Sequence, residues 1–353
     1  MPRAHASAIA RALVAVSALV LGAGCTELRY LTQASAGQAD LMDRQVDIDR
    51  IVREKRFSRR TRELLAAVGP IKAFGERHGL RATESYRTYV HLERDAVVWV
   101  VSACEPLSFL SKTWSFPITG SITYLGWFKK DEARAYATEL AHEGWDVDMR
   151  PAPAYSTLGF FDDPVISTMF VEGDAALGEL ADTILHESLH ATYFVPGQST
   201  LNESVASFVG EHLARVFLTE ARGPSSSELR AYDELEAFID ERGAKMSAAY
   251  KELEGIYASR ATPAEKLAKK LDVLTKLREA THARRELTNA SLVQYETYGS
   301  GQKELEALFA TCGASWPRFM KTLVAAKPTF QKARPHEDPA RLLAPVVAGG
   351  CAK

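Results

Sequence analysis

Cysteine is scarce in this chain. Only four cysteines occur among its 353 residues, and no two have the short spacing of a metal-binding pair. One of them, Cys25, follows the N-terminal segment described below. The other three, Cys104, Cys312 and Cys351, allow at most one disulfide and one free thiol in an oxidising compartment. Cys312 with Cys351 is one of the pairings that the sequence leaves open. These three cysteines are therefore expected to be structural.

The chain also lacks an excess of charge of one sign. Its 43 basic residues nearly balance its 45 acidic residues, which gives a net charge of −2 and a pI near 6.5. This composition gives no general attraction to nucleic acid, and the local basic clusters at 53–56 and 59–60 are typical of solvated helix faces. With 46% hydrophobic residues, the chain can bury a large core in one main domain with helical additions.

Long apolar runs are missing as well, apart from a short one at the N-terminus. Residues 12–23 are apolar but fall below the roughly 20 residues needed to cross a bilayer, so residues 1–24 are predicted to be a signal peptide. Leu21-Gly22-Ala23-Gly24-Cys25 resembles a bacterial lipoprotein processing site. Acyl chains on Cys25 would anchor the protein to a membrane in the cell envelope, facing the periplasm. An ordinary secretory signal with an incidental cysteine is the alternative.

What the chain does contain is the pattern His186-Glu187-Ser188-Leu189-His190, within a stretch predicted to be helical. Residues four apart leave the same face of a helix about 6 Å apart along its axis, so both imidazoles can bind one metal ion. Glu187 can then reach a water on that ion, as in zinc hydrolases. With nine histidines and 45 acidic residues, chance would supply about 0.03 such patterns. The alternative is a helix with two solvated histidines.

The flanking residues predict that this helix packs on a core. Leu177, Leu180 and Ile184 fall on one side of it, opposite the histidines. Asp174 is the candidate N-cap, and Pro196-Gly197 is expected to end the helix.

A catalytic zinc needs a third protein ligand and a fourth position open to water. Glu203 is the candidate, because it begins a second predicted helix. One face of that helix carries small residues that would allow close approach to the histidine helix: Ala206, Gly210 and Ala214. The alternative is a capping box at 200–203, in which Glu203 bonds to its own N-cap amide. Glu211 and His212 are the next candidates, about two turns further on.

The remaining elements predict a helix-rich α+β fold, with a zincin-like HExxH helix packed against a small sheet. Helices are expected over 31–52, 62–78, 129–144 and 288–326, and strands over 96–101, 121–125 and 145–149. Residues 224–286 predict a long helical hairpin, whose second helix begins with a Thr262–Glu265 capping box. The tail 327–353 contains four prolines and is expected to be poorly ordered.

Several segments resemble the zinc aminopeptidase family of bacterial lipoproteins. They are Ser85-Tyr86-Arg87-Thr88-Tyr89, Val97-Val98-Trp99, Thr113-Trp114-Ser115-Phe116-Pro117, the segment 155–164, the HExxH pattern, and Val195-Pro196-Gly197 leading into Asn202-Glu203-Ser204. The resemblance extends over about 25–326. It implies one zinc metallopeptidase-like domain, with Zn²⁺ as cofactor, Glu187 as catalytic residue and Glu203 as a gluzincin-like third ligand.

The chain departs from related enzymes in three respects. Ser115 stands where relatives tend to have cysteine, and the interval from His190 to Glu203 is shorter than in the best-known gluzincins. The chain also lacks the Gly-x-Met-Glu-Asn motif that holds a free α-amine in well-studied zinc aminopeptidases. The aminopeptidase specificity therefore comes from the resemblance, whereas the residues themselves indicate zinc hydrolysis.

The expected reaction is hydrolysis of a peptide substrate, in which Glu187 takes the proton of the attacking water. A donor must also stabilise the oxyanion. Tyr298 is the candidate, with Tyr295 behind it, although each could be an ordinary half-buried aromatic. Asp162 and Asp163 could hold a substrate amine or be plain turn residues. Two rival functions remain: a zinc hydrolase that cuts cell-wall peptides or amides, and a non-catalytic envelope lipoprotein that uses the hairpin for docking.

Overall fold

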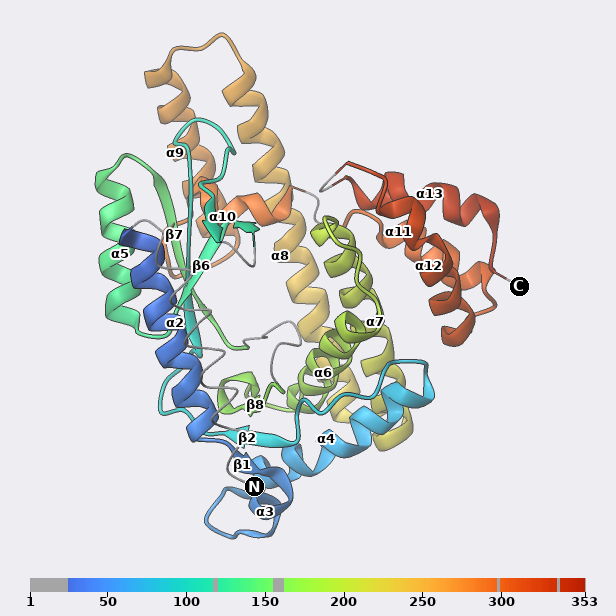
Figure 1. The fold of residues 1–353 in the computed structure, drawn as a ribbon. Coiled ribbons are helices and arrows are strands. Elements are labelled where there is room, and N and C mark those ends of the chain that lie inside the picture. The colour runs from blue at the N-terminus through green and yellow to red at the C-terminus, as the bar shows by residue number, and fades with distance from the viewer. Residues whose placement is uncertain (1–24, 117–119, 155–161, 297–298, 335–336, 353) are drawn as a thin grey trace. The chain divides into compact units, whose positions relative to one another are not determined.

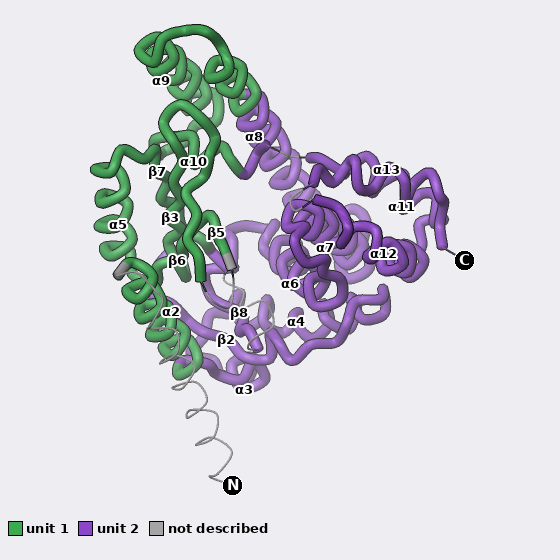
Figure 2. Tube along the Cα trace, turned by 45° about the horizontal axis from the view of Figure 1, so that its top comes forward, with its two compact units in different colours: residues 1–43, 96–152, 249–293 green, residues 44–95, 153–248, 294–353 purple. Residues whose placement is uncertain are grey.

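The computed structural model describes residues 25–116, 120–154, 162–296, 299–334 and 337–352. The segment predicted to be a signal peptide lies outside these ranges, and Cys25 is the first residue of helix α2 (Cys25–Asp43). The chain forms two compact units, coloured separately in Figure 2. Unit 1 contains Met1–Asp43, Ala96–Ala152 and Ala249–Val293, and unit 2 contains Arg44–Asp95, Pro153–Ala248 and Gln294–Lys353. Both units are therefore built from segments far apart in the sequence.

Unit 1 is built on a three-stranded antiparallel sheet in the order β6-β3-β7, whose strands are labelled in Figure 2. Its strands are β3 (Val98–Cys104), β6 (Tyr124–Trp127) and β7 (Asp146–Ala152), beside the two-stranded sheet of β4 (Trp114–Phe116) and β5 (Gly120–Ile122). The helices are α2, α5 (Lys130–His142), α9 (Pro263–Ala280), α10 (Asn289–Leu292) and the last part of α8 (Ser227–Ala258). Large aromatic side chains fill the core: Trp99, Trp114, Phe116, Trp127 and Tyr136.

A buried polar network fixes α9 and α10 to this sheet. The carboxylate of Asp146 on β7 accepts hydrogen bonds from Lys270 Nζ and from the Asn289 amide nitrogen, both at 2.6 Å. The Asn289 side chain in turn donates to the backbone oxygens of Glu105 and Ser108, each at 2.9 Å. Because every one of these groups is paired, the network holds the late helices beside strands from the first half of the chain.

Unit 2 is mostly helical. Its small sheet has the order β1-β2-β8, formed by β1 (Val46–Asp47), β2 (Thr88–Val90) and β8 (Val165–Ile166); β2 is antiparallel to β1 and parallel to β8. The helices are α3 (Ile48–Arg53), α4 (Arg59–Arg77), α6 (Ala176–Thr192), α7 (Ser199–Arg222), the first part of α8, α11 (Gln302–Thr311), α12 (Trp316–Phe330) and α13 (Pro339–Gly349), with 3-10 turns η1 (Ser167–Met169) and η2 (Val293–Tyr295). The main neighbours of α6 are the helices α4 and α7.

The predicted helix-rich α+β class is confirmed, and most predicted elements are present with shifted ends. The predicted helix 31–52 is wrong in its second half, because Val46–Asp47 pairs with β2 and Asp47 caps the new helix α3. The predicted strand 121–125 is two strands, since β5 pairs with β4 and β6 pairs with β3. The main neighbours of the HExxH helix in unit 2 are α4 and α7, and its packing against a small sheet stays a prediction.

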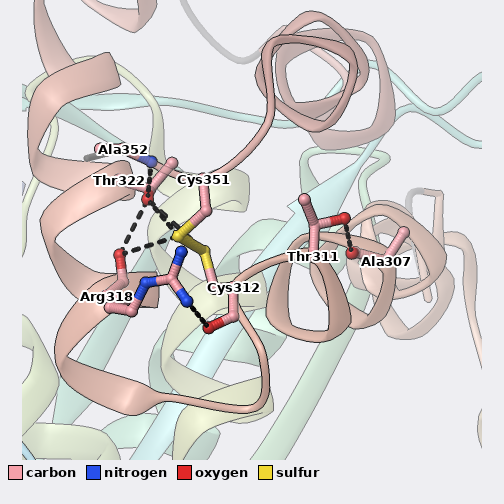
Figure 3. Close-up of a disulfide and its surroundings, with 7 residues drawn as sticks. All are labelled: Ala307, Thr311, Cys312, Arg318, Thr322, Cys351 and Ala352. Carbon is pink, nitrogen blue, oxygen red and sulfur yellow. Dashed lines mark hydrogen bonds between the residues drawn. A yellow bond between two sulfur atoms is a disulfide. The ribbon is translucent and has the colours of Figure 1, made fainter.

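The end of the chain is more ordered than the sequence predicts. Helix α12 continues to Phe330 and α13 follows it, with Asp338 as N-cap and Pro339 in the first turn. Proline favours the first turn of a helix, so counting prolines was misleading here. Leu343 and Phe330 are fully buried. A Cys312–Cys351 disulfide ties the segment after α13 to the end of α11, and the Thr322 hydroxyl lies 3.3 Å from the Cys351 sulfur (Figure 3).

We expect this disulfide to contribute substantially to the stability of unit 2. The bonded cysteines are 39 residues apart, and closing a loop of that length should stabilise the folded chain by about 4 kcal/mol through the entropy of the unfolded state. The double variant Cys312→Ser/Cys351→Ser should lose about this amount in urea unfolding. A reductant should lower the stability of the wild type similarly and leave the variant unchanged. Equal stabilities of wild type and variant would contradict this role.

Candidate metal centre

Helix α6 presents the two histidines because its apolar side is bound to a core. Leu180 and Ile184 are fully buried and Leu177 nearly so, as the periodicity predicts. The helix begins at Ala176 with Ala175 as N-cap, so the prediction of Asp174 as the cap is wrong. It ends at Thr192, after which Tyr193 is extended and Gly197 takes the left-handed conformation. The helix therefore ends close to the position predicted from Pro196-Gly197.

The helices α6 and α7 run side by side, and their approach depends on Gly210 (Figure 1). A Cβ atom on Gly210 would lie 2.3 Å from Asp182 Oδ1, 3.1 Å from His186 Cβ and 3.2 Å from the Asp182 carbonyl oxygen, so a larger residue would push the Asp182 side chain aside and crowd α6. Ala206 and Ala214 on the same face are fully buried. The close helix packing predicted from these small residues is thus present, and it brings the start of α7 to the histidines.

Three side chains converge at this point. His186 Nε2 and His190 Nε2 are 3.2 Å apart. Glu203 on α7 spans both rings, with Oε2 at 3.4 Å from His186 Nε2 and Oε1 at 3.5 Å from His190 Nε2. A tetrahedral ion with bonds of about 2.1 Å places its ligand atoms about 3.4 Å apart. The separations of 3.2–3.5 Å, in which each carboxylate oxygen faces a different ring, are close to this value, and one ligand atom from each residue lies within 4.8 Å of the others. These side chains therefore suit a single small cation.

The charges of Glu203 and His186 shift each other's pKa. Burial opposes ionisation of Glu203, but hydrogen bonds and positive charge from His186 and His190 outweigh it and lower the pKa of the carboxyl to about 2. Burial likewise opposes protonation of His186, yet the Glu203 carboxylate, followed by Glu187 and Asp182, raises the pKa of this imidazole. The other ring nitrogen of His190, Nδ1, is buried without a hydrogen-bond partner among the described residues. The arrangement therefore favours positive charge between the two rings.

The capping-box alternative for Glu203 does not hold. Helix α7 begins at Ser199, its N-cap is Gln198, and the cap makes no side-chain hydrogen bond. Thr200 therefore lies inside the helix, and the Glu203 carboxylate faces the imidazoles. Its side chain is still 64% exposed, so the group of three opens to solvent on the Glu203 side.

The other predicted site residues lie elsewhere or outside the described residues. His212 pairs with Glu306 at 3.1 Å, and Glu211 faces Arg215 at 3.8 Å, so neither joins the histidine pair. Glu187 is half-buried on α6, next to His186. Tyr298 falls outside the described residues. Asp162 is exposed whereas Asp163 is buried, and Tyr295 ends the turn η2.

Sequence reasoning missed a cluster of partly buried acids contributed by α6, before His186, and by α8. Carboxylate oxygens of Glu179, Asp182 and Glu236 lie within 4.8 Å of one another, and Tyr232 donates a hydrogen bond to Asp182 at 3.1 Å. Burial, together with the neighbouring negative charge of Asp182, raises the pKa of Glu179 to about 7. Burial and the charges of Glu211, Asp182 and Glu179 raise that of Glu236 to about 8. The i, i+3 spacing of Glu179 and Asp182 was the available signal, but their α8 partner is distant in sequence.

Comparison with known proteins places this geometry in context. Residues 29–336 match the model of a family described as "putative aminopeptidase". The chain belongs to this family. No match was found among curated proteins or among solved structures. Membership of the aminopeptidase family indicates peptide hydrolysis, and the family match includes α6 and α7 and therefore the convergent histidines and glutamate.

The buried acids give the fold a defined pH dependence. The folded protein keeps a proton on Glu236 up to about pH 8, whereas the carboxyl ordinarily loses it near 4.5. Because the folded state then binds more protons than the unfolded chain, the free energy of unfolding should fall between these pH values by about 1.4 kcal/mol per unit. Glu236→Gln, which cannot ionise, should flatten this decline in urea unfolding measured at pH 6, 7 and 8.

Glu234→Gln is the matched control, because Glu234 is exposed on the same helix. It should leave the pH dependence of stability unchanged. Parallel curves for wild type and Glu236→Gln would show that Glu236 ionises normally.

Proposed function

We propose that this protein is a zinc-dependent aminopeptidase that hydrolyses peptide bonds in the bacterial cell envelope. One observation carries the proposal: His186, His190 and Glu203 bring one ligand atom each within 4.8 Å of one another, and Glu187 follows His186 directly. Two histidines and one carboxylate are a donor set that suits zinc, and three protein ligands leave the fourth position free, as catalytic zinc sites do. Membership of the aminopeptidase family supports the peptide as substrate.

In this proposal each residue has a separate task. His186, His190 and Glu203 hold the ion. When bound, zinc lowers the pKa of a water toward neutrality and polarises the substrate carbonyl. Glu187 would accept a proton from the attacking water and would deliver it to the departing amine nitrogen. Asp182, on the turn before His186, contributes negative charge that favours a positively charged centre.

The location of the protein is also part of the proposal. Cys25 would carry the acyl chains of a lipoprotein and begin the mature chain, directly at the start of α2. Among the described residues, no helix is long and apolar enough to cross a membrane. A lipid anchor at Cys25 would therefore hold the protein at the membrane surface.

Variants of two carboxylates, Glu203 on α7 and Glu187 on α6, distinguish metal binding from proton transfer. Glu203→Gln replaces a charged ligand with a neutral amide, so zinc content and peptidase activity should fall together. Glu187→Gln should keep zinc bound, while kcat falls by at least about 100-fold because the water loses its base. Zinc is measured by metal analysis, and activity on a peptide mixture by mass spectrometry.

Glu220→Gln is the matched control, since Glu220 is exposed near the end of α7. It should retain both zinc and activity. The products separate the rival reactions: free amino acids released from N-termini support an aminopeptidase, internal fragments an endopeptidase, and cleavage of cell-wall peptides or amides alone a wall hydrolase. Full turnover by Glu203→Gln would remove Glu203 from the ligand set.

The lipid anchor makes a separate prediction. Wild-type protein should fractionate with membranes and carry the mass of acyl chains on Cys25. Cys25→Ser cannot be acylated, so it should lose this mass and appear in the soluble fraction. Cys104→Ser is the control, because it changes a cysteine that the proposal does not acylate. This variant should remain in the membrane fraction. An unchanged distribution of Cys25→Ser would refute the anchor.

A further inference from the structure

Tyr86 adopts an unusual backbone conformation. Its φ is +65°, and the other non-glycine residues with positive φ among those described are His282 and Ala314, both exposed. Tyr86, by contrast, is buried, with 7% of its surface exposed. The left-handed region is unfavourable for a bulky residue, and such residues persist only where their surroundings hold them in place. They occur most often at functional sites.

The surroundings of Tyr86 do hold it in place. Its backbone N–H donates to the Asp163 carbonyl at 2.6 Å, and the Asp163 N–H donates to Ser85 Oγ at 3.1 Å. Lys72 on α4 donates through Nζ to the carbonyls of Thr83, at 2.8 Å, and of Ser85. Two of the segments that carry the family resemblance, Ser85–Tyr89 and 155–164, are thereby joined at Tyr86.

The segment before Tyr86 is fixed to the second half of α6. The Arg81 amide nitrogen donates to Thr192 Oγ1 at 2.8 Å, two residues beyond His190. Leu80 and Leu185 both lie against Gly75 on α4. Leu80 and Arg81, a few residues before Tyr86, therefore lie beside the second half of α6, which carries Glu187.

The phenol of Tyr86 is available as a hydrogen-bond donor. Burial raises its pKa well above the ordinary value, and the charges of Glu187 and Asp163 raise it further, so the phenol keeps its proton at neutral pH. Both carboxylates act on the phenol through their charge and not through a hydrogen bond. A residue whose task was to orient Glu187 would already be bonded to it.

We propose that Tyr86 is a catalytic residue of this site, whose O–H donates a hydrogen bond to the scissile carbonyl oxygen as that oxygen gains negative charge. The inference rests on the proposed function and assigns the donor for which the sequence indicated Tyr298. It explains why a buried tyrosine with positive φ is fixed within reach of the Glu187 charge: a donor aimed at developing charge must be fixed before the reaction begins.

Tyr86→Phe tests the proposal, because it removes only the hydroxyl and keeps the buried ring. The zinc-loaded variant should show kcat reduced by about 100- to 1,000-fold, the loss typical of removing one oxyanion donor, with KM nearly unchanged. Its affinity for a phosphinic dipeptide, whose tetrahedral anion replaces the scissile bond, should fall by a similar factor in calorimetry. Zinc content and thermal unfolding should match the wild type.

Tyr193→Phe is the matched control, because Tyr193 is a fully buried tyrosine at the end of α6 whose hydroxyl has no partner among the described residues. It should keep wild-type kcat and inhibitor affinity. Tyr86→His keeps a hydrogen-bond donor on a shorter side chain, so it should recover part of kcat and part of the inhibitor affinity. This variant keeps the proposal testable if Tyr86→Phe folds poorly.

The outcomes separate this inference from the proposed function. An active wild type with unchanged kcat and inhibitor affinity in Tyr86→Phe overturns the role of Tyr86 and leaves the peptidase intact. A zinc-loaded wild type that hydrolyses no peptide overturns the proposed function, and this inference with it.

Discussion

The close approach of α6 and α7 at Gly210 is the constraint on which the candidate centre depends. Each of the two histidines is placed by α6 alone, but Glu203 reaches them only because α7 has no side chain at this contact. A methyl group there would meet Asp182 and the Cβ of His186, two residues on the polar side of the same helix. Helix packing and site geometry are therefore a single property, since displacing one helix would separate carboxylate from imidazole.

The same packing explains the buried acids. Helices that approach closely bury whatever their contact faces carry, and here these faces carry Asp182 from α6 and Glu236 from α8, with Arg215 from α7 as a cation that acts on both. The fold keeps them by leaving carboxyl groups protonated and by bonding Asp182 to Tyr232. This mostly acidic cluster costs stability at neutral pH. It also raises the pKa of His186, as expected of a site that binds positive charge.

Local sequence patterns predicted the elements, whereas distant partners decided their ends. The apolar stripe of α6, the Thr262–Glu265 cap and the HExxH spacing are all contained in a few consecutive residues, and each is present as predicted. The predictions for Val46–Asp47 and for 121–125 were wrong because their strand partners lie elsewhere in the chain. Val46–Asp47 pairs with β2, whereas the run 121–125 is divided between β5, which pairs with β4, and β6, which pairs with β3. The sequence predicted one main domain, and because each unit is made of interleaved segments, no single point in the sequence separates them.

The site shows the same limit at the level of single residues. From sequence, Glu203 could be a metal ligand or part of a helix cap. The structure excludes the cap, because α7 begins at Ser199, and the small residues allow α7 to approach the histidines. Tyr86 could not be found in this way, because a positive φ in an aromatic residue has no sequence signature. The conformation depends on hydrogen bonds with Asp163, Lys72 and Thr192, which lie on separate elements and hold the segment around Tyr86. Strain imposed by several distant contacts is invisible to local propensity, and for that reason it is informative about function once the structure reveals it.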